Sequence, residues 1–350
     1  MKLLFLDQFS EPGGAQQCLL DLLPALSYAK HQATVAMPGS GPIFERVRSL
    51  GFQTARITCG PYASGAKSAG DLTRFVLDTP SLARQIRHLA RGADLVYING
   101  PRLLPAAALS GIRKPVVFHS HSYLAPGPVR KLSGLALRRL RAHVIASCRY
   151  VVEPWMPYAS DISIVYNGVA GPANARQPRN GPLTVGCIGR IAPEKGQREF
   201  VKVARIVHAR MPEARFVIYG ETMFASQDYE REVRAAAAGL PIEFAGWVAD
   251  VHDALARLDV LLVPSAPHEA TTRVILEAFA AAVPVIAFPS GGIPEVLPPG
   301  SLAHSIQEMA ELVGRTPWSA RVPQDPLLAS HAYTLERYRA EILDVLLRLT

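Results

Sequence analysis

Residues 183–219, LTVGCIGRIAPEKGQREFVKVARIVHARMPEARFVIY, decide the fold. The stretch opens with an apolar run of strand length and continues through a loop over 189–196. A helical pattern over 196–210 and a second apolar run over 216–219 follow. A strand, a helix and a strand in this order predict a parallel βαβ unit. The apolar residues of its helix share one face: Phe200, Val203, Ala204 and Val207.

The same alternation runs along the whole chain, so we predict an α/β protein of two doubly wound, Rossmann-like domains that face a cleft. An N-terminal domain is expected over 1–166 and a C-terminal domain over 183–333. The residues between them, 167–182, are rich in Gly, Pro, Asn and Ala and predict a linker. A final helix over 334–350 is expected to pack back on the first domain. Strands are expected at 2–6, 33–37, 94–98, 116–119, 143–146, 162–165, 183–188, 216–219, 242–244, 260–263 and 285–287.

Composition agrees with two ordinary globular cores. The chain has 350 residues, of which 49% are apolar and 19% charged, and about 150 residues per domain is typical. No apolar run reaches the roughly 18 residues needed to span a bilayer, and Asp7 interrupts the first apolar run too early for a signal peptide. The four cysteines are scattered, which disfavours disulfides and zinc. We therefore expect a cytoplasmic protein.

The loop over 189–196 is a candidate phosphate site. It follows a buried strand and opens a helix, where free backbone N–H groups and the helix dipole favour anions. Arg190 and Lys195 flank that helix start and together could neutralise a diphosphate. Two solvated surface cations that bind nothing are an equally good interpretation of this segment taken alone.

A second candidate site contains two glutamates separated by seven residues. Glu269 is expected in a loop at the carboxyl end of a strand, and Glu277 two turns into the apolar helix that follows. A partly buried carboxylate needs hydrogen-bond donors, and a ribose diol would supply two. The plainer interpretation is an exposed ion pair between Arg273 and Glu277, one helical turn apart. Residue chemistry alone favours that pair.

The N-terminal half offers weaker signals. Gly13 and Gly14 follow the first strand and allow a ligand to approach the backbone, although no G-x-G-x-x-G fingerprint is present. His119 and His121 end a strand, where histidines are usually structural. The sequence contains no D-x-D, Walker A or G-x-S-x-G motif. Metal-dependent and serine-nucleophile chemistry are therefore disfavoured.

Taken together, these residues resemble the retaining glycosyltransferases of family 4, which have the two-domain GT-B fold. The resemblance is most specific over 183–297 and rests on several motifs in a characteristic order. They are Gly13-Gly14, Asn167-Gly168-Val169, Gly189-Arg190, Glu194-Lys195-Gly196, Phe244-Ala245-Gly246, Pro264-Ser265, Glu269-x7-Glu277, Pro284-Val285 and Gly291-Gly292-Ile293-Pro294-Glu295.

The resemblance implies a role for each candidate residue. The N-terminal domain would be the acceptor side and the C-terminal domain would bind a nucleotide sugar. Glu269 would hydrogen-bond the donor sugar, Glu277 would hold the ribose, and His119 would lie beside the sugar as the second catalytic residue. The base would lie near Gly246-Trp247-Val248. The other donor-binding residues would be Gly13, Gly14, Arg190, Lys195, Thr272, Arg273 and Val274.

The reaction implied is the transfer of a hexose-like group, with retention and without a cofactor or metal, to a hydroxyl acceptor. That acceptor would be a glycan, a lipid-linked molecule or a small molecule. The family commonly has glycines after its first glutamate, where this chain has Ala270-Thr271-Thr272. The usual glycine before Pro-Val is Val283, preceded by Ala282. These departures alter the sugar pocket more than the nucleotide site.

The formal charge of +8 suits anionic partners. Spread over 350 residues it is modest, and no basic and aromatic stretch predicts nucleic-acid binding. The Arg-rich segment 129–141 could touch anionic lipid, which would place the protein peripherally at the inner face of the membrane. An ordinary helix with a solvated basic face is the favoured interpretation. The loop over 60–70 is expected near the acceptor.

Two other functions remain open. A nucleotide-sugar 2-epimerase shares the fold but lacks the Glu-x7-Glu arrangement, and it would change the sugar without an acceptor. A non-catalytic nucleotide-sugar-binding protein would tolerate the loss of Glu269 and His119 with its ligand binding intact.

Overall fold

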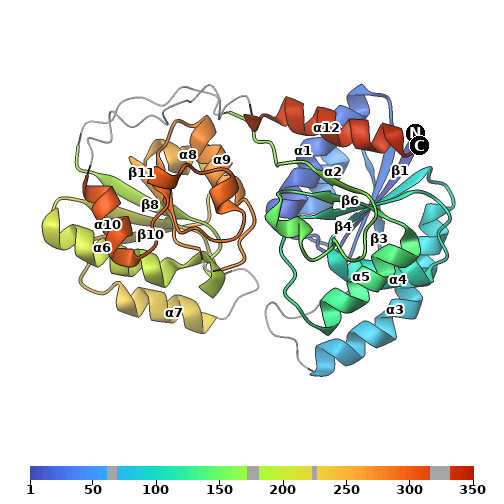
Figure 1. Ribbon diagram of the computed structural model, residues 1–350, viewed down its shortest axis with the longest axis horizontal. Helices are drawn as coiled ribbons and strands as arrows, with labels where there is room; N and C mark the ends of the chain where they lie inside the picture. Colours follow the sequence, from blue (N-terminus) through green and yellow to red (C-terminus); the bar gives the residue numbers. More distant parts are fainter. Residues whose placement is uncertain (61–68, 172–180, 223–226, 266, 316–331) are drawn as a thin grey trace. The chain divides into compact units, whose positions relative to one another are not determined.

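The computed structural model describes residues 1–60, 69–171, 181–222, 227–265, 267–315 and 332–350. They form two compact units (Figure 1). The first contains Met1–Gly168 and Leu335–Thr350, and the second contains Val169–Thr334. The chain thus passes from the first unit to the second and returns for its last helix. Most of the expected linker, residues 172–180, lies outside the described residues, as do residues 61–68 of the expected acceptor loop.

The first unit is a parallel sheet in the order β3-β2-β1-β4-β5-β6-β7. Every neighbouring pair runs in the same direction. Six of these strands match the prediction within one residue, whereas β3 was not predicted, because its short segment is only half-buried at the sheet edge. The strands are β1 (Lys2–Asp7), β2 (Gln32–Met37), β3 (Gln53–Arg56), β4 (Leu95–Asn99), β5 (Val116–Ser120), β6 (His143–Ala146) and β7 (Ile162–Ile164).

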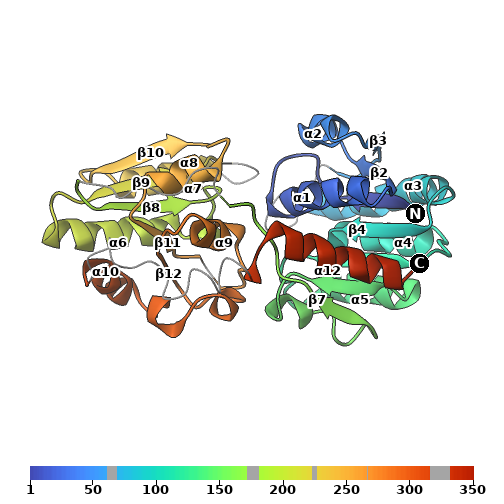
Figure 2. The same cartoon turned by 90° about the horizontal axis from the view of Figure 1, so that it is seen from above.

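Helices cover both faces of this sheet, as the alternation along β1 requires. Leu3 and Phe5 face a core shared with α1, α2 and α12, while Leu4 and Leu6 face a core shared with α3, α4 and α5. The last helix lies alongside α1 (Figure 2), so the C-terminal residues complete the first unit. These helices are α1 (Gly14–Tyr28), α2 (Ile43–Ser49), α3 (Ala69–Ala90), α4 (Leu104–Leu109), α5 (Pro128–Leu140) and α12 (Leu335–Arg348).

The second unit is a parallel sheet in the order β10-β9-β8-β11-β12. Its strands are β8 (Thr184–Ile188), β9 (Arg215–Tyr219), β10 (Ile242–Gly246), β11 (Val260–Val263) and β12 (Val285–Ala287). One face carries α6 (Gln197–Arg210), α7 (Gln227–Ala236) and α10 (Ile306–Gly314). The other carries α8 (Val251–Ala256) and α9 (Arg273–Ala280). Short 3-10 helices are η1 (Pro101–Leu103), η2 (Tyr150–Val152), η3 (Pro193–Lys195), η4 (Ile293–Glu295) and η5 (Pro299–Ser301).

Each sheet has one point at which the strand order reverses. In the first unit it lies between β1 and β4, and in the second between β8 and β11. The connections on either side leave such a point in opposite directions, which opens a crevice at the carboxyl ends of the two strands. Ligands of doubly wound folds bind in that crevice, so these two points are where functional residues are expected.

Candidate active site

The reversal point of the second unit is built by two loops in backbone contact. Gly196 follows the loop after β8, and its φ of +72° is one that L side chains rarely adopt. A Cβ at this position would lie 1.8 Å from the carbonyl oxygen of Pro264, which follows β11. Glycine at position 196 is therefore required both by its backbone angle and by the close approach of the two loops.

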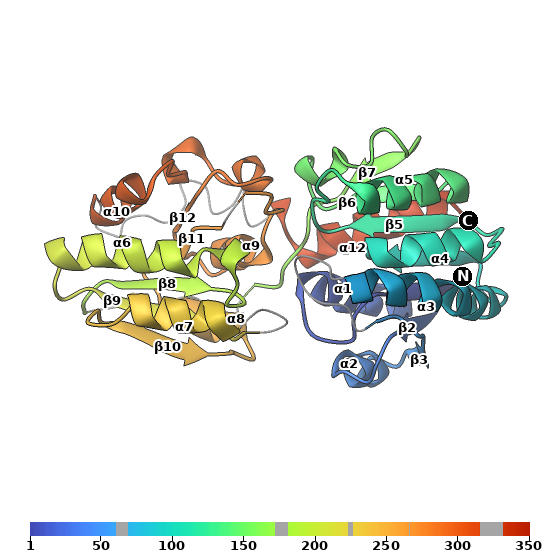
Figure 3. The ribbon, with the colours of Figure 1, turned by 90° about the horizontal axis from the view of Figure 1, so that it is seen from below.

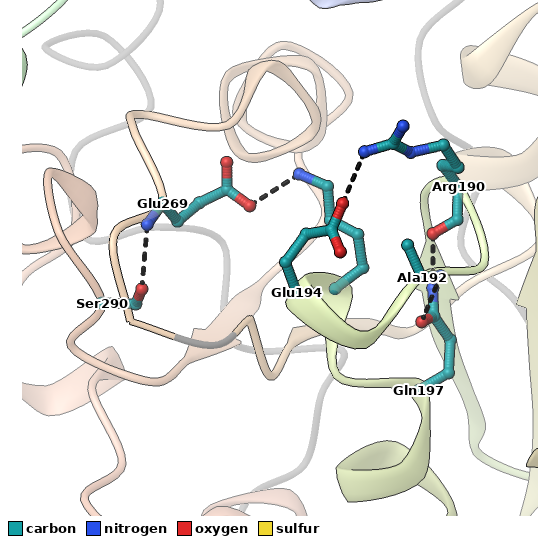
Figure 4. A network of polar contacts seen from close by, with 7 residues as sticks. Arg190, Ala192, Glu194, Gln197, Glu269 and Ser290 are labelled. Atoms are coloured by element: carbon teal, nitrogen blue, oxygen red, sulfur yellow. Dashed lines mark hydrogen bonds and ion pairs between the residues drawn. The ribbon is translucent and has the colours of Figure 1, made fainter. Parts of the chain in front are cut away.

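Lys195 and Glu269 join these loops by an ion pair. The Nζ atom of Lys195 lies 2.6 Å from Oε2 of Glu269, and the side chains are only 24% and 15% exposed. In Figure 4 a dashed line joins the labelled Glu269 to this ammonium group. The backbone N–H of Glu269 donates to Oγ of Ser290 at 3.2 Å, so the loop after β12 also holds this residue. The interpretation of Lys195 as a solvated surface cation is wrong, because its ammonium group is held at the reversal point.

Arg190 is placed differently. Its guanidinium lies 2.5 Å from Oε1 of Glu194 within the same loop, and both side chains are more exposed than the Lys195–Glu269 pair. The buried Gln197 fixes the loop itself (Figure 4). Its Nε2 donates to the carbonyl of Arg190 at 2.9 Å, and its Oε1 accepts from the N–H of Ala192 at 3.3 Å. Gln197 was missed in the sequence because a polar residue at a helix start gives no sign of burial.

The second glutamate forms the ion pair expected from its spacing, but in a largely buried setting. Nε of Arg273 lies 3.4 Å from Oε1 of Glu277, with side chains 13% and 15% exposed. The predicted pair is therefore present, but it is not on an exposed face. Glu277 lies one turn into α9, not two, because the helix begins only at Arg273, after the N-cap Thr272. Val274 is buried against the second unit's core.

The ends of β9 and β10 complete this edge of the sheet. The N–H of Gly220 donates to the carbonyl of Gly246 at 2.7 Å, and the carbonyl of Glu221 accepts from Ile191 at 3.0 Å. Val248, two residues beyond β10, is half-buried, whereas Trp247 is exposed. The loops after β8, β9 and β10 are thus tied together. The side chain of Glu221 also accepts from the N–H of Trp247 at 3.4 Å. Glu221 was missed in the sequence analysis because no motif marks it.

A buried polar pair lies at the other reversal point, in the first unit. Asp7 ends β1 and Asn99 ends β4, and Nδ2 of Asn99 donates to Oδ2 of Asp7 at 2.5 Å. Gln16 in α1 donates to the other carboxylate oxygen at 2.7 Å. Burial raises the pKa of Asp7 to about 6, although the hydrogen bonds from Asn99, Phe9 and Gln16 oppose this. Gly13 and Gly14 are exposed at the start of α1, in the same turn as Gln16.

The two histidines lie beside this pair. The ring of His121 donates through Nε2 to Oδ1 of Asn99 at 2.7 Å, and its centroid lies 3.8 Å from that of His119. His119 is 1% exposed, and its Nδ1 lies 2.5 Å from the hydroxyl of Tyr97. Burial and the neighbouring His121 hold the pKa of His119 well below its ordinary value, so the ring is neutral. The sequence analysis missed four residues of this cluster because β1 and α1 are distant in the chain from β4: Asp7, Gln16, Tyr97 and Asn99.

Outside the gaps in the description, no three His, Cys, Asp or Glu side chains lie together as metal ligands would. Over the same residues, no helix has the length and apolar character to cross a membrane.

Comparison with known families covers both units. Residues 12–170 match the model of the family described as Glycosyltransferase Family 4, and residues 182–315 match that described as Glycosyl transferases group 1. The chain carries both glycosyltransferase domains. Its two parallel-sheet domains have the GT-B fold, so the predicted fold class is confirmed.

Solved GT-B structures align over nearly the whole chain. HepE of Anabaena, determined in complex with UDP and glucose, is 24% identical, with 99% of each chain covered and a TM-score of 0.82. A glycosyltransferase from Rickettsia africae is 16% identical, with 98% of this chain and 97% of the other covered and a TM-score of 0.75. At these identities the likeness establishes the fold alone.

Curated relatives match over shorter segments. The sulfoquinovosyl transferase SQD2 of Arabidopsis thaliana is 31% identical over 113 residues, 32% of this chain and 20% of its own length. A GDP-mannose-dependent mannosyltransferase of Corynebacterium glutamicum, which acts on a monoacylated phosphatidylinositol monomannoside, is 33% identical over 127 residues, 33% of this chain and 32% of its own length. This GT-B chain thus matches only a fifth to a third of these relatives' length.

Proposed function

We propose that this GT-B protein is a retaining glycosyltransferase that moves a hexose-like group from a nucleoside-diphosphate sugar to an acceptor hydroxyl. The observation that carries the proposal is the Lys195–Glu269 pair across the β8/β11 reversal point. The named activities of the relatives and the UDP-glucose complex of HepE support the same class of donor.

Diphosphate binding would rearrange that pair. A diphosphate brings two negative charges to an ammonium group that already has a carboxylate partner. Lys195 would turn to the phosphate, with Arg190 adding a second cation. Glu269 would then be free to accept hydrogen bonds from hydroxyls of the donor sugar. The ion pair thus keeps a largely buried carboxylate satisfied until the donor arrives.

The transfer step places its developing charge on the same cations. The bond from the anomeric carbon to the diphosphate oxygen breaks as the acceptor oxygen attacks from the same face. The acceptor proton passes to the departing phosphate oxygen. Arg190 and Lys195 would stabilise the charge on the leaving diphosphate, an electrostatic role that a metal has in other transferases. We therefore propose that the reaction needs no metal.

The nucleoside would lie against α9 and the end of β10. Glu277 is largely buried beside the guanidinium of Arg273 at 3.4 Å, and a carboxylate can accept several hydrogen bonds at once. A ribose diol would supply two such donors. The exposed indole of Trp247 and the half-buried Val248 provide an apolar surface for a base at the same edge of the sheet.

The test is a calorimetric titration with UDP, GDP, ADP and dTDP in parallel, followed by incubation with the sugars of the nucleotide that binds. A glycosyltransferase transfers the sugar, or hydrolyses the donor slowly, and releases the diphosphate with EDTA present. An epimerase would change the sugar with no acceptor, and a binding protein would leave the donor intact. Absence of binding by all four nucleotides would refute the donor site.

We also propose a peripheral contact with anionic membranes at the inner face, in a cytoplasmic protein. The basic charge is not spread evenly. Residues 79–141 carry eleven Lys and Arg against the single Asp94, a net +10, whereas the whole chain carries +8. These residues include most of α3, all of α4 and all of α5, which lie side by side on one face of the first sheet (Figure 3).

Aliphatic side chains are exposed among these cations. Leu132 and Leu135 are 47% and 48% exposed one helical turn apart on α5, close to Lys131 and Arg138. Leu109 of α4 is exposed next to Ala108, whose carbonyl accepts from the guanidinium of Arg139. Apolar groups surrounded by cations and nearly free of carboxylates suit an anionic bilayer better than a nucleic acid.

A further inference from the structure

His119 belongs to the buried polar group of the first unit that also contains Asp7, Tyr97 and Asn99. Its hydrogen-bond contacts determine which of its two ring nitrogens carries the proton. Its Nδ1 faces the hydroxyl of Tyr97 at 2.5 Å. Its Nε2 is buried and has no hydrogen-bond partner among the residues that the structure describes. For the buried Tyr97 hydroxyl, the same residues provide His119 as its hydrogen-bond partner and no other.

Two proton arrangements are compatible with these contacts. If Nδ1 carried the ring proton and donated to Tyr97, both the phenol O–H and the Nε2 lone pair would be unsatisfied. If Tyr97 donates to Nδ1, the ring proton lies on Nε2, and only the Nε2–H is unsatisfied. A buried donor without an acceptor is costly, so the second arrangement is favoured.

The neighbouring ring is fixed by an independent chain of contacts. A carboxylate only accepts hydrogen bonds, so Asp7 must face the NH₂ group of Asn99 and not its oxygen. The amide oxygen of Asn99 therefore faces His121, whose Nε2 must carry a proton to donate to it. Asp7 in this way determines the tautomer of a histidine that it does not touch.

We infer that Tyr97 holds His119 as the Nε2–H tautomer and presents that N–H to an oxygen atom of the bound substrate. Tyr97, Asn99 and Asp7 are positioning residues. The identity of the oxygen rests on the proposed function: it belongs either to a hydroxyl of the donor sugar or to its diphosphate. The tautomer itself does not depend on that function.

The geometry explains why two histidines are placed together. The His121 ring, tilted by 38° over His119, is held by Asn99 and limits the rotation of its neighbour. Tyr97 determines which nitrogen of His119 is protonated, and His121 limits where the ring can turn. A neutral N–H donor can bind an oxygen without the large desolvation cost of a buried imidazolium.

The test is ¹⁵N NMR of protein labelled at its ten histidines. His119→Gln identifies the His119 signals by their loss. We expect a protonated Nε2 and an unprotonated, hydrogen-bonded Nδ1 at neutral pH. Tyr97→Phe should move the Nδ1 signal to that of a nitrogen without a hydrogen bond. Tyr338→Phe is the matched control, because it removes another buried hydroxyl of the first unit, which donates to the Cys18 carbonyl.

Ligand titrations identify the oxygen. A shift of the His119 Nε2–H signal with UDP-glucose but not with UDP indicates a sugar hydroxyl, and a shift with both indicates a phosphate. Turnover in Tyr97→Phe should fall about tenfold, while Tyr338→Phe stays within about twofold of wild type. A proton on Nδ1 in the wild-type protein overturns the inference. Failure of UDP-glucose to bind would refute that donor, while the tautomer spectra would still decide the inference.

Discussion

The ammonium group of Lys195 lies 2.6 Å from the carboxylate of Glu269, and these residues follow two neighbouring strands at the point where the sheet order reverses. Because their loops touch through Gly196 and Pro264, the pair is held by backbone geometry and not by side-chain reach alone. The cation would attract a diphosphate, and the carboxylate would compete with the diphosphate for that cation. Removing the charge of Lys195 and removing that of Glu269 should therefore affect diphosphate affinity differently.

Lys195→Ala should weaken binding of the nucleoside diphosphate by about 1–3 kcal/mol, the range for hydrogen bonds to charged groups. Glu269→Gln should leave that affinity unchanged or raise it severalfold, because the diphosphate no longer competes with a carboxylate. Lys202→Ala, which removes an exposed lysine of α6, is the control. Calorimetry that shows the same loss of affinity in both site variants would contradict the competition.

Glu277→Ala should weaken binding of the nucleoside diphosphate and of the free nucleoside by a similar amount, about 1–3 kcal/mol, if the carboxylate holds the ribose. Glu341→Ala removes a similar i,i+4 partner, that of Arg337 in α12, and should not change nucleotide affinity. A loss of thermal stability in Glu277→Ala with unchanged affinity for both ligands would indicate that the ion pair is only structural.

Ala282→Gly should stabilise the protein by about 1 kcal/mol. Ala282 follows the end of α9 with a φ of +53°, a conformation costly for alanine, and the next N–H bonds back to Ala278 in the manner of a Schellman cap. Ala280→Gly, the same change at the last residue of α9, should destabilise by at most about 1 kcal/mol. Urea unfolding followed by fluorescence measures both, and the same sign in both variants would contradict the prediction.

Asp7 should make stability depend on pH between about 4 and 6. Its folded-state pKa of about 6 lies above the ordinary 3.8, so the folded protein binds more protons in this range. The resulting stability is fully present below pH 3.8 and is lost as the pH rises through 6. Relative to Asp7→Asn, the wild type should gain up to about 3 kcal/mol from pH 7 to pH 4. A constant difference in free energy of unfolding over that range would refute the burial argument.

Co-sedimentation with vesicles tests the basic face. The protein should sediment with phosphatidylglycerol-containing vesicles at low salt and not with pure phosphatidylcholine. Leu132→Ser with Leu135→Ser, and separately Lys131→Glu with Arg138→Glu, should each reduce the bound fraction about tenfold. Leu347→Ser is the control, since Leu347 is similarly exposed on α12, which belongs to the other face of the sheet. Equal binding by all variants, or binding only to nucleic acid or acidic protein, would contradict the proposal.

The strands and the fold class were accessible from sequence because buried parallel strands are continuous apolar runs. Those of β6, β11 and β12 match their predicted limits residue for residue. The half-buried β3 lacks that signal and was not predicted. The start of α9 was predicted too early because no residue pattern between Glu269 and Thr272 distinguishes an extended loop from a first helical turn.

The sequence by itself determined the two α/β domains, the loops that follow their strands, and the charged residues those loops contain, because apolar periodicity and local motifs are properties of the linear chain. Only the tertiary structure decided that Lys195 meets Glu269, that the Arg273–Glu277 pair is buried, and that Asp7 reaches His121 through Asn99. The Lys195–Glu269 contact and the Asp7–Asn99–His121 chain join residues at the ends of strands that are neighbours in the sheet but distant in the chain. The burial of the Arg273–Glu277 pair depends on how α9 packs on the sheet. The order of strands that brings them together is a property of packing, which no single segment encodes.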